Sequence, residues 1–171
     1  RHPKRFLDGF TGYLVTDGMA SYPALKTVTN CGCWAHLRRE FLKQNGGKIP
    51  KEGTGLRKGF DLVEALFMLE RESHDLSPDA RLNERRKRSA PILEEFWRWC
   101  TSENRLKSDT CHKPIGYATN QKQALCAFLL DGRIPITNND AENAIRPFVV
   151  GRKNWLFCNT TNGAKASASV Y

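Results

Sequence analysis

Apolar residues recur along the chain at two spacings, one typical of strands and the other of helices. Residues 12–16 and 28–33 are short apolar or β-branched runs, and such runs bounded by turn residues predict strands. Residues 34–43 carry apolar side chains three and four positions apart, which predicts an amphipathic helix. A short helix over 20–25, limited by Pro23, is expected between the two strands. The expected buried face of the longer helix consists of Trp34, Leu37, Phe41 and Leu42.

Two longer helical patterns follow a segment rich in glycine. Residues 45–59 contain five glycines and one proline, and they predict a loop. Amphipathic helices are then expected over 60–73 and from 81 to about 105, with Pro78 between them. A further helix is expected over 121–130. The middle of the chain is therefore predicted to be mostly helical.

The last part of the chain opens with another helix signal. Asn139 is a residue type favoured at the N-cap, and the pattern after it predicts a helix that Pro147 ends or kinks. Residues 151–157 are expected to form a basic turn that leads into an aromatic strand or helix. The small residues of 164–170 predict one more helix.

Charge and composition narrow the class of protein. The 171 residues include 27 lysines and arginines against 18 acids, a net charge of +9. This balance favours a polyanionic partner, nucleic acid before a membrane surface, although an ordinary basic protein has the same composition. The longest strictly apolar run, Leu125 to Leu130, has six residues, whereas a membrane-spanning helix needs about 20. A soluble intracellular protein with reduced cysteines is expected.

Two carboxylates are candidates for chemistry. Asp17 follows the first predicted strand, and ligands collect at the carboxyl ends of strands in α/β sheets. The alternative for Asp17 is a simple Asp-Gly turn with Gly18. Glu142 stands three residues after Asn139, the spacing of a capping box, and four residues before Arg146, the spacing of a helical ion pair. Taken alone, Glu142 therefore fits a cap as well as a metal ligand.

Cysteine, histidine and basic residues form further clusters. Cys33 and His36 have C-x-x-H spacing, and Cys31 with Cys111-His112 could complete a zinc site. These spacings lack the paired pattern of a zinc finger, so zinc is not expected, and His36 is interpreted as a hydrogen-bonded or supporting residue. The chain has no Walker loop, no G-x-G-x-x-G element and no G-x-S-x-G nucleophile elbow.

The basic residues differ in what they suggest. Arg85 to Arg88 are expected to form a solvated helix face, as such runs usually do. Arg152 and Lys153 precede Trp155 and Phe157, and cations beside aromatic side chains suit phosphate and base contacts.

Four segments, in this order, resemble one family of proteins. They are Gly12 to Gly18, Cys33 to Phe41, Asn138 to Pro147 and Gly151 to Phe157. Together they resemble the insertion-sequence-66 family of bacterial DDE transposases over nearly the whole chain, and the loop at 45–59 matches least. Met19 stands where a tyrosine is expected, and Asn143 where an arginine is expected. Neither change removes a candidate metal ligand.

The resemblance implies an α/β, RNase H-like fold in which three acids hold two divalent metal ions, Mg²⁺ or Mn²⁺. It assigns Asp17 as the second acid and Glu142 as the third. Cys33, His36 and Asn139 are expected to support them. The resemblance implies DNA as the partner and the bacterial cytoplasm as the location. It also allows for a homo-oligomer of the chain. The residues expected to contact DNA are Arg38, Arg39, Arg146, Arg152 and Lys153.

The separation of the two acids, 142 − 17 = 125 residues, predicts an insertion between them. Residues 1–43 are expected to form a partial core, 44–133 a mostly helical insertion, and 134–171 the return to the core. The first acid of the family is expected upstream. The chain is therefore interpreted as the C-terminal part of a catalytic domain, either a fragment or the remnant of a decayed element, and is expected to be inactive by itself. Two alternatives are a non-catalytic DNA-binding or regulatory protein and a zinc-stabilised structural module.

Overall fold

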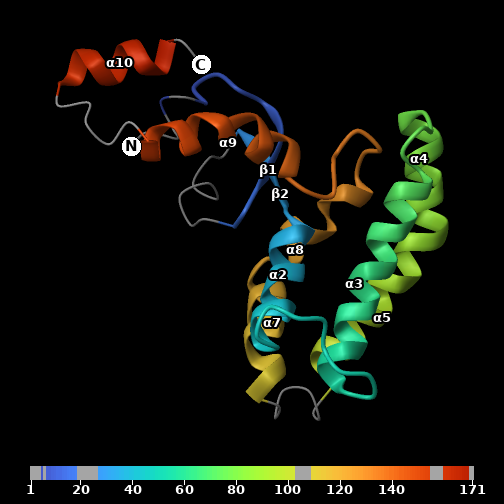
Figure 1. The fold of residues 1–171 in the computed structure, drawn as a ribbon. Coiled ribbons are helices and arrows are strands. Elements are labelled where there is room, and N and C mark those ends of the chain that lie inside the picture. The colour runs from blue at the N-terminus through green and yellow to red at the C-terminus, as the bar shows by residue number, and fades with distance from the viewer. Residues whose placement is uncertain (1–4, 6, 19–26, 103–108, 155–159, 170–171) are drawn as a thin grey trace. The chain divides into compact units, whose positions relative to one another are not determined.

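The computed structural model describes residues 5, 7–18, 27–102, 109–154 and 160–169 (Figure 1). The chain forms two compact units, Arg1–Thr137 and Asn138–Tyr171, and each is described by itself. The fold is α/β and mostly helical, with a two-stranded parallel sheet among the described residues. The predicted short helix at 20–25 lies outside the described residues.

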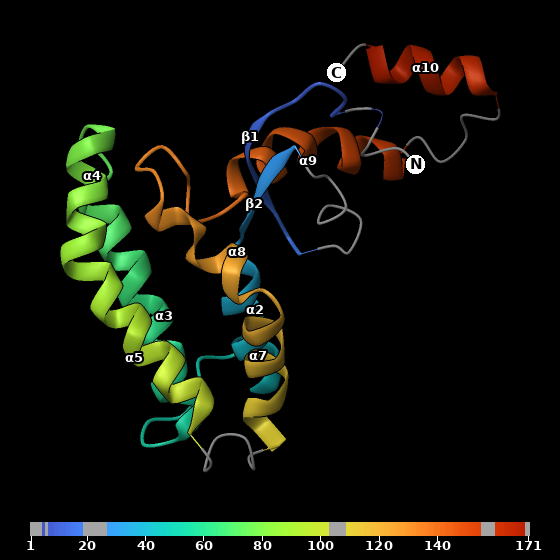
Figure 2. The same ribbon diagram turned by 180° about the vertical axis from the view of Figure 1, so that it is seen from behind.

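The sheet pairs two strands in the positions that the sequence predicts. Strand β1 (Gly12–Thr16) runs parallel to β2 (Val28–Gly32), with Gly12 opposite Val28 and Thr16 opposite Gly32. The second strand ends one residue earlier than predicted, because Cys33 already takes the N-cap position of the next helix. Helix α8 (Lys122–Cys126) packs on β2 (Figure 2). At Gly32 a Cβ atom would lie 3.0 Å from Leu125, so the glycine permits this close approach.

Helix α2 (Trp34–Gln44) packs beside α7 (Asp109–Asn120). The predicted inner face of α2 is confirmed: Trp34, Leu37 and Phe41 are fully buried, and Leu42 packs partly buried against the same core. The indole of Trp34 donates to the carbonyl of Leu125 at 2.9 Å, which ties α2 to α8.

The sequence patterns did not predict α7. Pro114 lies inside this helix, and an internal proline normally counts against a helix because it removes one backbone hydrogen bond. Pro114 is nevertheless buried, and Cys111, Ile115 and Ala118 share the spacing of one buried helix face. Packing of this face therefore outweighs the local cost of the proline.

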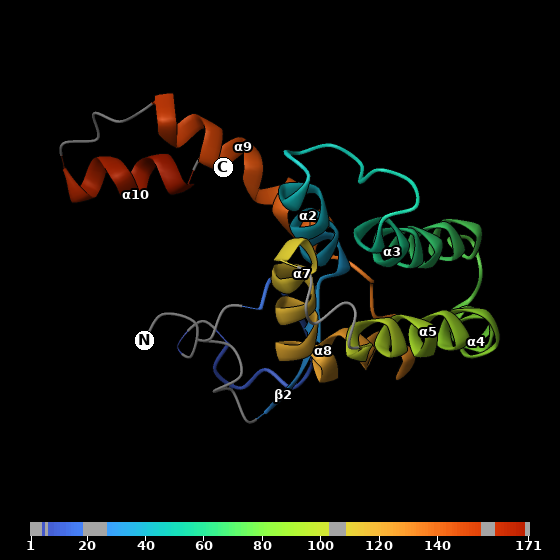
Figure 3. The same ribbon diagram turned by 90° about the horizontal axis from the view of Figure 1, so that it is seen from below.

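A helical arm extends from this core. Helix α3 (Gly55–Glu72) lies beside a second run of helix made of α4 (Pro78–Glu84), the π-helical turn η1 (Arg85–Ser89) and α5 (Ala90–Thr101) (Figures 1 and 3). Pro78 occupies the first turn of α4, where a proline is tolerated. The arm is thus a helical hairpin.

Helix α3 begins five residues earlier than the predicted start at residue 60. The Thr54 hydroxyl accepts the Arg57 amide at 3.1 Å and caps the helix, so the loop predicted for 45–59 is wrong in its last five residues. Residue 59 lies inside the helix, and it is a glycine because a Cβ atom there would overlap the Trp99 ring. The glycine serves helix packing, whereas the sequence suggested a loop.

Arg85 corrects the prediction of a solvated basic face at 85–88. Its side chain is only 1% exposed. The guanidinium makes a bidentate ion pair with Glu70, at 2.7 and 2.6 Å, and donates to the carbonyls of Phe128, Asp131 and Ile134 at 2.8 to 3.0 Å. Arg85 therefore binds the arm to the segment that follows α8.

The other members of that basic run are exposed as predicted, namely Arg86, Lys87 and Arg88. Arg88 pairs with Glu72 at 2.7 Å on the surface of the arm. The helix predicted to reach residue 105 ends at Thr101.

The predicted helix at 121–130 is present as α8 followed by a 3₁₀ turn, η2 (Ala127–Leu129). The chain then returns to the start of α2. Ile134 and Ile136 are buried, and the Ile136 carbonyl accepts the Trp34 amide at 3.0 Å. This bond fixes the end of the first unit beside the first residue of α2.

The second unit contains α9 (Asn139–Asn154) and α10 (Thr161–Ser169). Helix α10 confirms the prediction from the small residues of 164–170, although it starts three residues earlier. In α9 the Asn138 carbonyl accepts the Glu142 amide at 3.0 Å. Asn138 is therefore the N-cap residue, and the prediction that Asn139 fills that position is wrong by one residue.

Pro147 does not end α9, which continues to Asn154. A proline removes one intrahelical hydrogen bond, and the residues after it can still pair with the preceding turn. The basic turn expected at 151–157 is therefore wrong for residues 151–154, which form the last turn of the helix. Trp155 and Phe157 lie outside the described residues.

In the part of the chain that the structure describes, no helix has both the length and the apolar character needed to span a membrane.

Candidate functional site

The carboxyl end of the sheet brings Asp17 and Cys33 together. Each residue directly follows one of the two parallel strands, and the Cys33 amide donates to the Thr16 carbonyl at 3.1 Å, one register step beyond the last strand pair. Asp17 is half-buried and Cys33 is buried. Asp17 directly follows β1, as predicted. This end of the strands is where α/β sheets place ligands, and the role of Asp17 as a ligand stays a prediction.

Tyr117 of α7 and Gln121, the residue after α7, hold the turn that follows β1. The Tyr117 hydroxyl donates to the Asp17 carbonyl at 3.0 Å, and the side-chain Nε2 of Gln121 donates to the Gly18 carbonyl at 3.4 Å. Gly18 has a φ of +86°, which favours glycine, and a Cβ atom there would lie 2.9 Å from the Gln121 side chain. The turn carrying Asp17 is thus fixed by two side chains one helical turn apart.

Tyr117 remains a neutral hydrogen-bond donor at this edge. Burial is the main cause that raises the pKa of Tyr117 to about 12, and the neighbouring Cys33 and Asp17 add to the rise. The protonated phenol can donate to the Asp17 carbonyl across the physiological pH range. Sequence reasoning missed Tyr117, on α7, and Gln121, which directly follows that helix, because α7 itself was not predicted.

Cys33 and His36 both belong to the start of α2. The His36 amide donates to the Cys33 carbonyl at 3.2 Å, and the Cys33 side chain forms no capping hydrogen bond. His36 is half-buried. The two residues therefore stand one helical turn apart next to the Asp17 edge, and their supporting role stays a prediction.

The zinc alternative lacks a ligand cluster in the described part of the chain. No group of three or more histidine, cysteine or acidic side chains there could hold a metal ion. Cys31 and Cys111 are both buried in the hydrophobic core, and burial raises the pKa of Cys31 to about 11. The five described cysteines are free thiols.

Glu142 and its neighbours lie in the second unit. Glu142 is half-buried in the first turns of α9, while Asn139 and Arg146 are exposed. Arg152 and Lys153 belong to the last turn of the same helix. Asp17 and Glu142 thus occupy different units, and their meeting at one metal centre stays a prediction.

The two arginines predicted on α2 have different surroundings. Arg38 forms an ion pair with Glu64 of α3, and its guanidinium lies 5.3 Å from the centre of the Phe60 ring. Arg39 is exposed. Arg38 therefore contributes to packing between α2 and α3, and Arg39 is the more accessible of the two for a phosphate contact.

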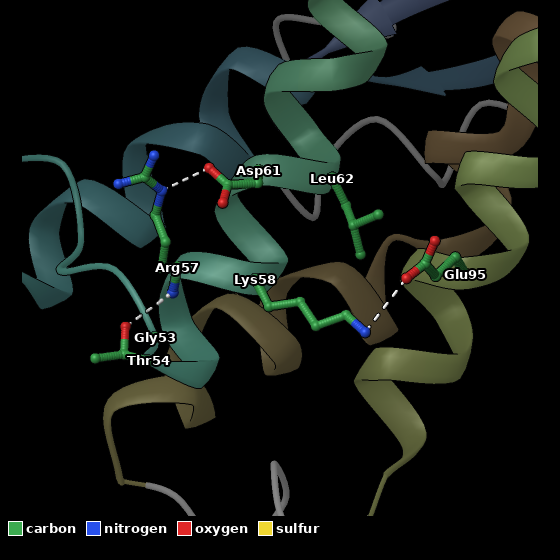
Figure 4. A pocket seen from close by; sticks show the side chains of 7 residues that line it. All are labelled: Gly53, Thr54, Arg57, Lys58, Asp61, Leu62 and Glu95. Carbon is green, nitrogen blue, oxygen red and sulfur yellow. Dashed lines mark hydrogen bonds and ion pairs between the residues drawn. The ribbon is translucent and has the colours of Figure 1, made fainter.

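A cavity of about 500 Å³ lies beside the first turns of α3 and next to α5 (Figure 4). Two cations line it, and both are paired: Arg57 with Asp61 at 2.6 Å, and Lys58 with Glu95 at 3.3 Å. Glu52 lies 4.0 Å from Arg57 as well. The carboxylates around these cations leave no excess positive charge, so the cavity is poorly suited to DNA phosphate.

Several curated proteins are similar to the chain. Two uncharacterized proteins of Sinorhizobium fredii (strain NBRC 101917 / NGR234), y4hP and y4qI, are 30% and 34% identical over 185 and 179 residues. These matches cover 98% and 97% of the chain, but 34% and 32% of the relatives. A third, y4jD from the same strain, is 29% identical over 182 residues, which cover 98% of the chain and 34% of the relative. The chain thus spans about a third of the length of these relatives.

No solved structure matches the chain. A family model described as "Transposase IS66 family" matches residues 1–166. This match covers all four segments on which the resemblance was based. The chain therefore belongs to the IS66 family of transposases.

Proposed function

We propose that the chain supplies two of the three catalytic carboxylates, Asp17 and Glu142, of a transposase that cuts and joins DNA. The observation that carries this proposal is the position of Asp17 at the carboxyl end of β1, beside the end of a parallel partner strand. Family membership adds a role in transposition, DNA as partner and a divalent metal ion. In this proposal residues 1–43 and 134–171 build an RNase H-like core, and 44–133 are an insertion.

The path of the chain after the insertion supports a shared site. Ile136 is hydrogen-bonded to Trp34, the residue after Cys33, and Cys33 is hydrogen-bonded to the residue before Asp17. Glu142 follows Ile136 by only 142 − 136 = 6 residues, a stretch that spans at most about 20 Å when fully extended. This short connection limits how far the chain allows Glu142 to lie from Ile136.

The two acids offer the donor atoms that a hard divalent ion prefers. Mg²⁺ is bound through carboxylate and water oxygens, and the thiol of Cys33 is a poor ligand for it. When bound, a pair of such ions stabilises the attacking and leaving oxygens of an in-line phosphoryl transfer. Asp17 and Glu142 would provide oxygen ligands, and Tyr117 with Gln121 would keep the Asp17 turn in place.

The basic residues would bind the DNA backbone around this centre. Arg39 and Arg146 are exposed, and Arg152 and Lys153 are close to each other in the sequence at the end of α9. Contacts from such residues to phosphates fix the position of DNA without reading its sequence.

A double-mutant cycle on metal affinity tests the shared site. Mn²⁺ affinity of the 171-residue chain is measured by isothermal titration for Asp17→Asn, Glu142→Gln and the double variant, with the exposed Asp79→Asn as the control. If both acids bind one ion, each single change weakens binding and the second change adds little, because effects on a shared ligand set are not additive. Independent effects, or affinities equal to that of Asp79→Asn, would overturn the proposal.

A further inference from the structure

A second cavity, of about 470 Å³, lies within the first unit between the first half of β2 and the segment from the end of α7 to Leu130. Four carboxamide side chains line it, together with apolar groups such as Val28 and Leu130. The carboxamides are Asn30, Asn120, Gln121 and Gln123. We call this cavity the carboxamide pocket.

The chemistry of the carboxamide pocket favours a neutral, planar ligand with a polar edge. Carboxamides present donors and acceptors without charge, so they match neither the charge of a phosphate nor that of a metal ion. Asparagine and glutamine do match nucleobase edges, adenine above all, whose N6 donor and N7 acceptor pair with one carboxamide. Apolar groups such as Val28 and Leu130 suit the faces of a base.

Asn30 provides an independent sign of an unmet hydrogen bond. Its side chain lines the carboxamide pocket, yet its Oδ1 atom is buried and accepts no hydrogen bond within the described structure. Buried polar atoms in proteins are nearly always paired, so such an exception calls for an explanation. Because Oδ1 is buried, a ligand N–H can meet it only after a turn about the broad χ2 torsion of asparagine, which brings Oδ1 to the place now held by Nδ2.

The carboxamide pocket adjoins the turn that carries Asp17. Gln121 lines the pocket and also donates to the carbonyl of Gly18, the residue after Asp17. One helical turn earlier, Tyr117 donates to the Asp17 carbonyl itself. A ligand that moves Gln121 would therefore act directly on the backbone of the proposed catalytic acid.

We propose that the carboxamide pocket binds an unpaired nucleobase bearing an exocyclic amino group, with adenine as the preferred base. The inference rests on the proposed function, because the base belongs to the DNA on which the transposase acts. Such a base must leave the duplex stack or come from a single-stranded stretch. The pocket would then hold one nucleotide of the strand next to the Asp17 edge.

Fluorescence anisotropy with single-stranded oligothymidine probes tests this site. One probe carries a central adenine and the other a central abasic position, and binding to the 171-residue chain is measured in EDTA at fixed salt. We expect the adenine probe to bind about tenfold more tightly, in line with the discrimination given by a paired carboxamide. Asn30→Leu should reduce this ratio to below about twofold, and Gln123→Ala should reduce it partly.

The thermal midpoint separates a ligand site from a structural role of Asn30. Leucine removes the unpaired buried oxygen and keeps the branched outline of asparagine, so Asn30→Leu should unfold at the same temperature as the parent or higher. The matched control is Asn83→Leu, at an exposed position of α4 outside the pocket, which should keep the tenfold ratio. Gln123 is exposed, so Gln123→Ala should fold normally. If Asn30→Leu fails to fold, the affinity ratio of Gln123→Ala tests the inference instead.

Equal binding of the two probes by the parent, or an unchanged ratio in both pocket variants, would overturn the inference. The result is independent of the metal centre because the assay contains EDTA. If the parent shows no base discrimination but the double-mutant cycle on Mn²⁺ affinity gives the expected result, only the base-binding role of the carboxamide pocket is rejected. If the Mn²⁺ double-mutant cycle contradicts a shared metal site but the adenine probe still binds more tightly, the catalytic proposal is rejected and the base-binding proposal is retained.

Discussion

The helical arm and the sheet edge of the first unit are built by different means. In the arm, apolar and aromatic side chains fill the space, with Phe96 and Trp99 at 5.7 Å between ring centres, and the buried charge of Arg85 is fully paired. At the sheet edge, backbone turns are held by single hydrogen bonds from Tyr117 and Gln121. The arm therefore maximises packing, whereas the edge keeps polar groups near the surface.

This difference indicates that the arm serves mainly stability, whereas the carboxyl end of the sheet serves ligand binding. Binding and catalytic groups retain unpaired or half-buried polar atoms at a cost in stability, and the surrounding scaffold offsets that cost. Asp17 is half-buried at the carboxyl end of the sheet, and the unpaired Asn30 oxygen belongs to the middle of β2. Substitutions in the arm should accordingly act on unfolding, and those at the edge on ligand binding.

The largest expected effect comes from breaking the Arg85 site. Arg85→Met removes a buried cation and leaves Glu70 and three carbonyls without their partner, which should cost about 3–5 kcal/mol of unfolding free energy. Urea unfolding followed by circular dichroism measures the change.

Arg88→Met is the matched control from the same basic run. Arg88 is exposed and pairs with Glu72 on the surface, so its loss should cost only about 0–1 kcal/mol. Equal losses at the two positions would mean that the buried pair does not organise the arm.

Two glycines inside helices should respond in opposite directions. At Gly59 an added Cβ atom overlaps the Trp99 ring, so Gly59→Ala should destabilise the chain by about 1–3 kcal/mol. At Gly116 of α7 nothing lies within 4 Å of an added Cβ atom, so Gly116→Ala should stabilise by about 0.5–1 kcal/mol. Thermal unfolding compares the two, and the prediction fails if their signs agree.

Charge reversal separates the basic residues of the arm from those of α9. Arg152→Glu with Lys153→Glu should weaken binding of duplex DNA about tenfold and reduce its salt dependence, because two phosphate contacts are lost. Arg86→Glu with Lys87→Glu, on the exposed face of the arm, should change affinity by less than about twofold. Filter binding at several salt concentrations measures both. A stronger effect from the arm would move the DNA surface onto the helical hairpin.

The sequence predicted those elements whose pattern is local. Strands β1 and β2 and helix α2 were found because a few neighbouring residues define them. Helix α7 was missed because Pro114 obscured its buried face. The position of Asp17 at a strand end also follows from local pattern.

Contacts between distant residues could not be predicted in this way. The Arg85 partners lie 15 to 49 residues away, and Tyr117 is 100 residues from Asp17. A basic run is normally exposed, so nothing local to residues 85–88 marks Arg85 as buried. Only the folded packing of the arm against the segment after α8 reveals it.

The smallest expected effect concerns the hydroxyl of Tyr117. Tyr117→Phe removes its hydrogen bond to the Asp17 carbonyl and should cost about 0.5–1.5 kcal/mol. Because the folded state raises the pKa of Tyr117 from 10.0 to about 12, the group favours folding most fully below pH 10. That contribution declines as the pH rises from 10 through 12, where the unfolded chain releases the proton first.

Urea unfolding of the parent and of Tyr117→Phe between pH 8 and pH 12 isolates this contribution. The free-energy difference between the two proteins should be largest at pH 8 and shrink above pH 10, since phenylalanine has no proton to lose. A difference that stays constant to pH 12 would contradict a raised pKa for the partly buried phenol. Weaker Mn²⁺ binding by Tyr117→Phe at pH 8 would further show that the hydroxyl orients Asp17, because a hydroxyl that serves stability alone would leave metal affinity unchanged.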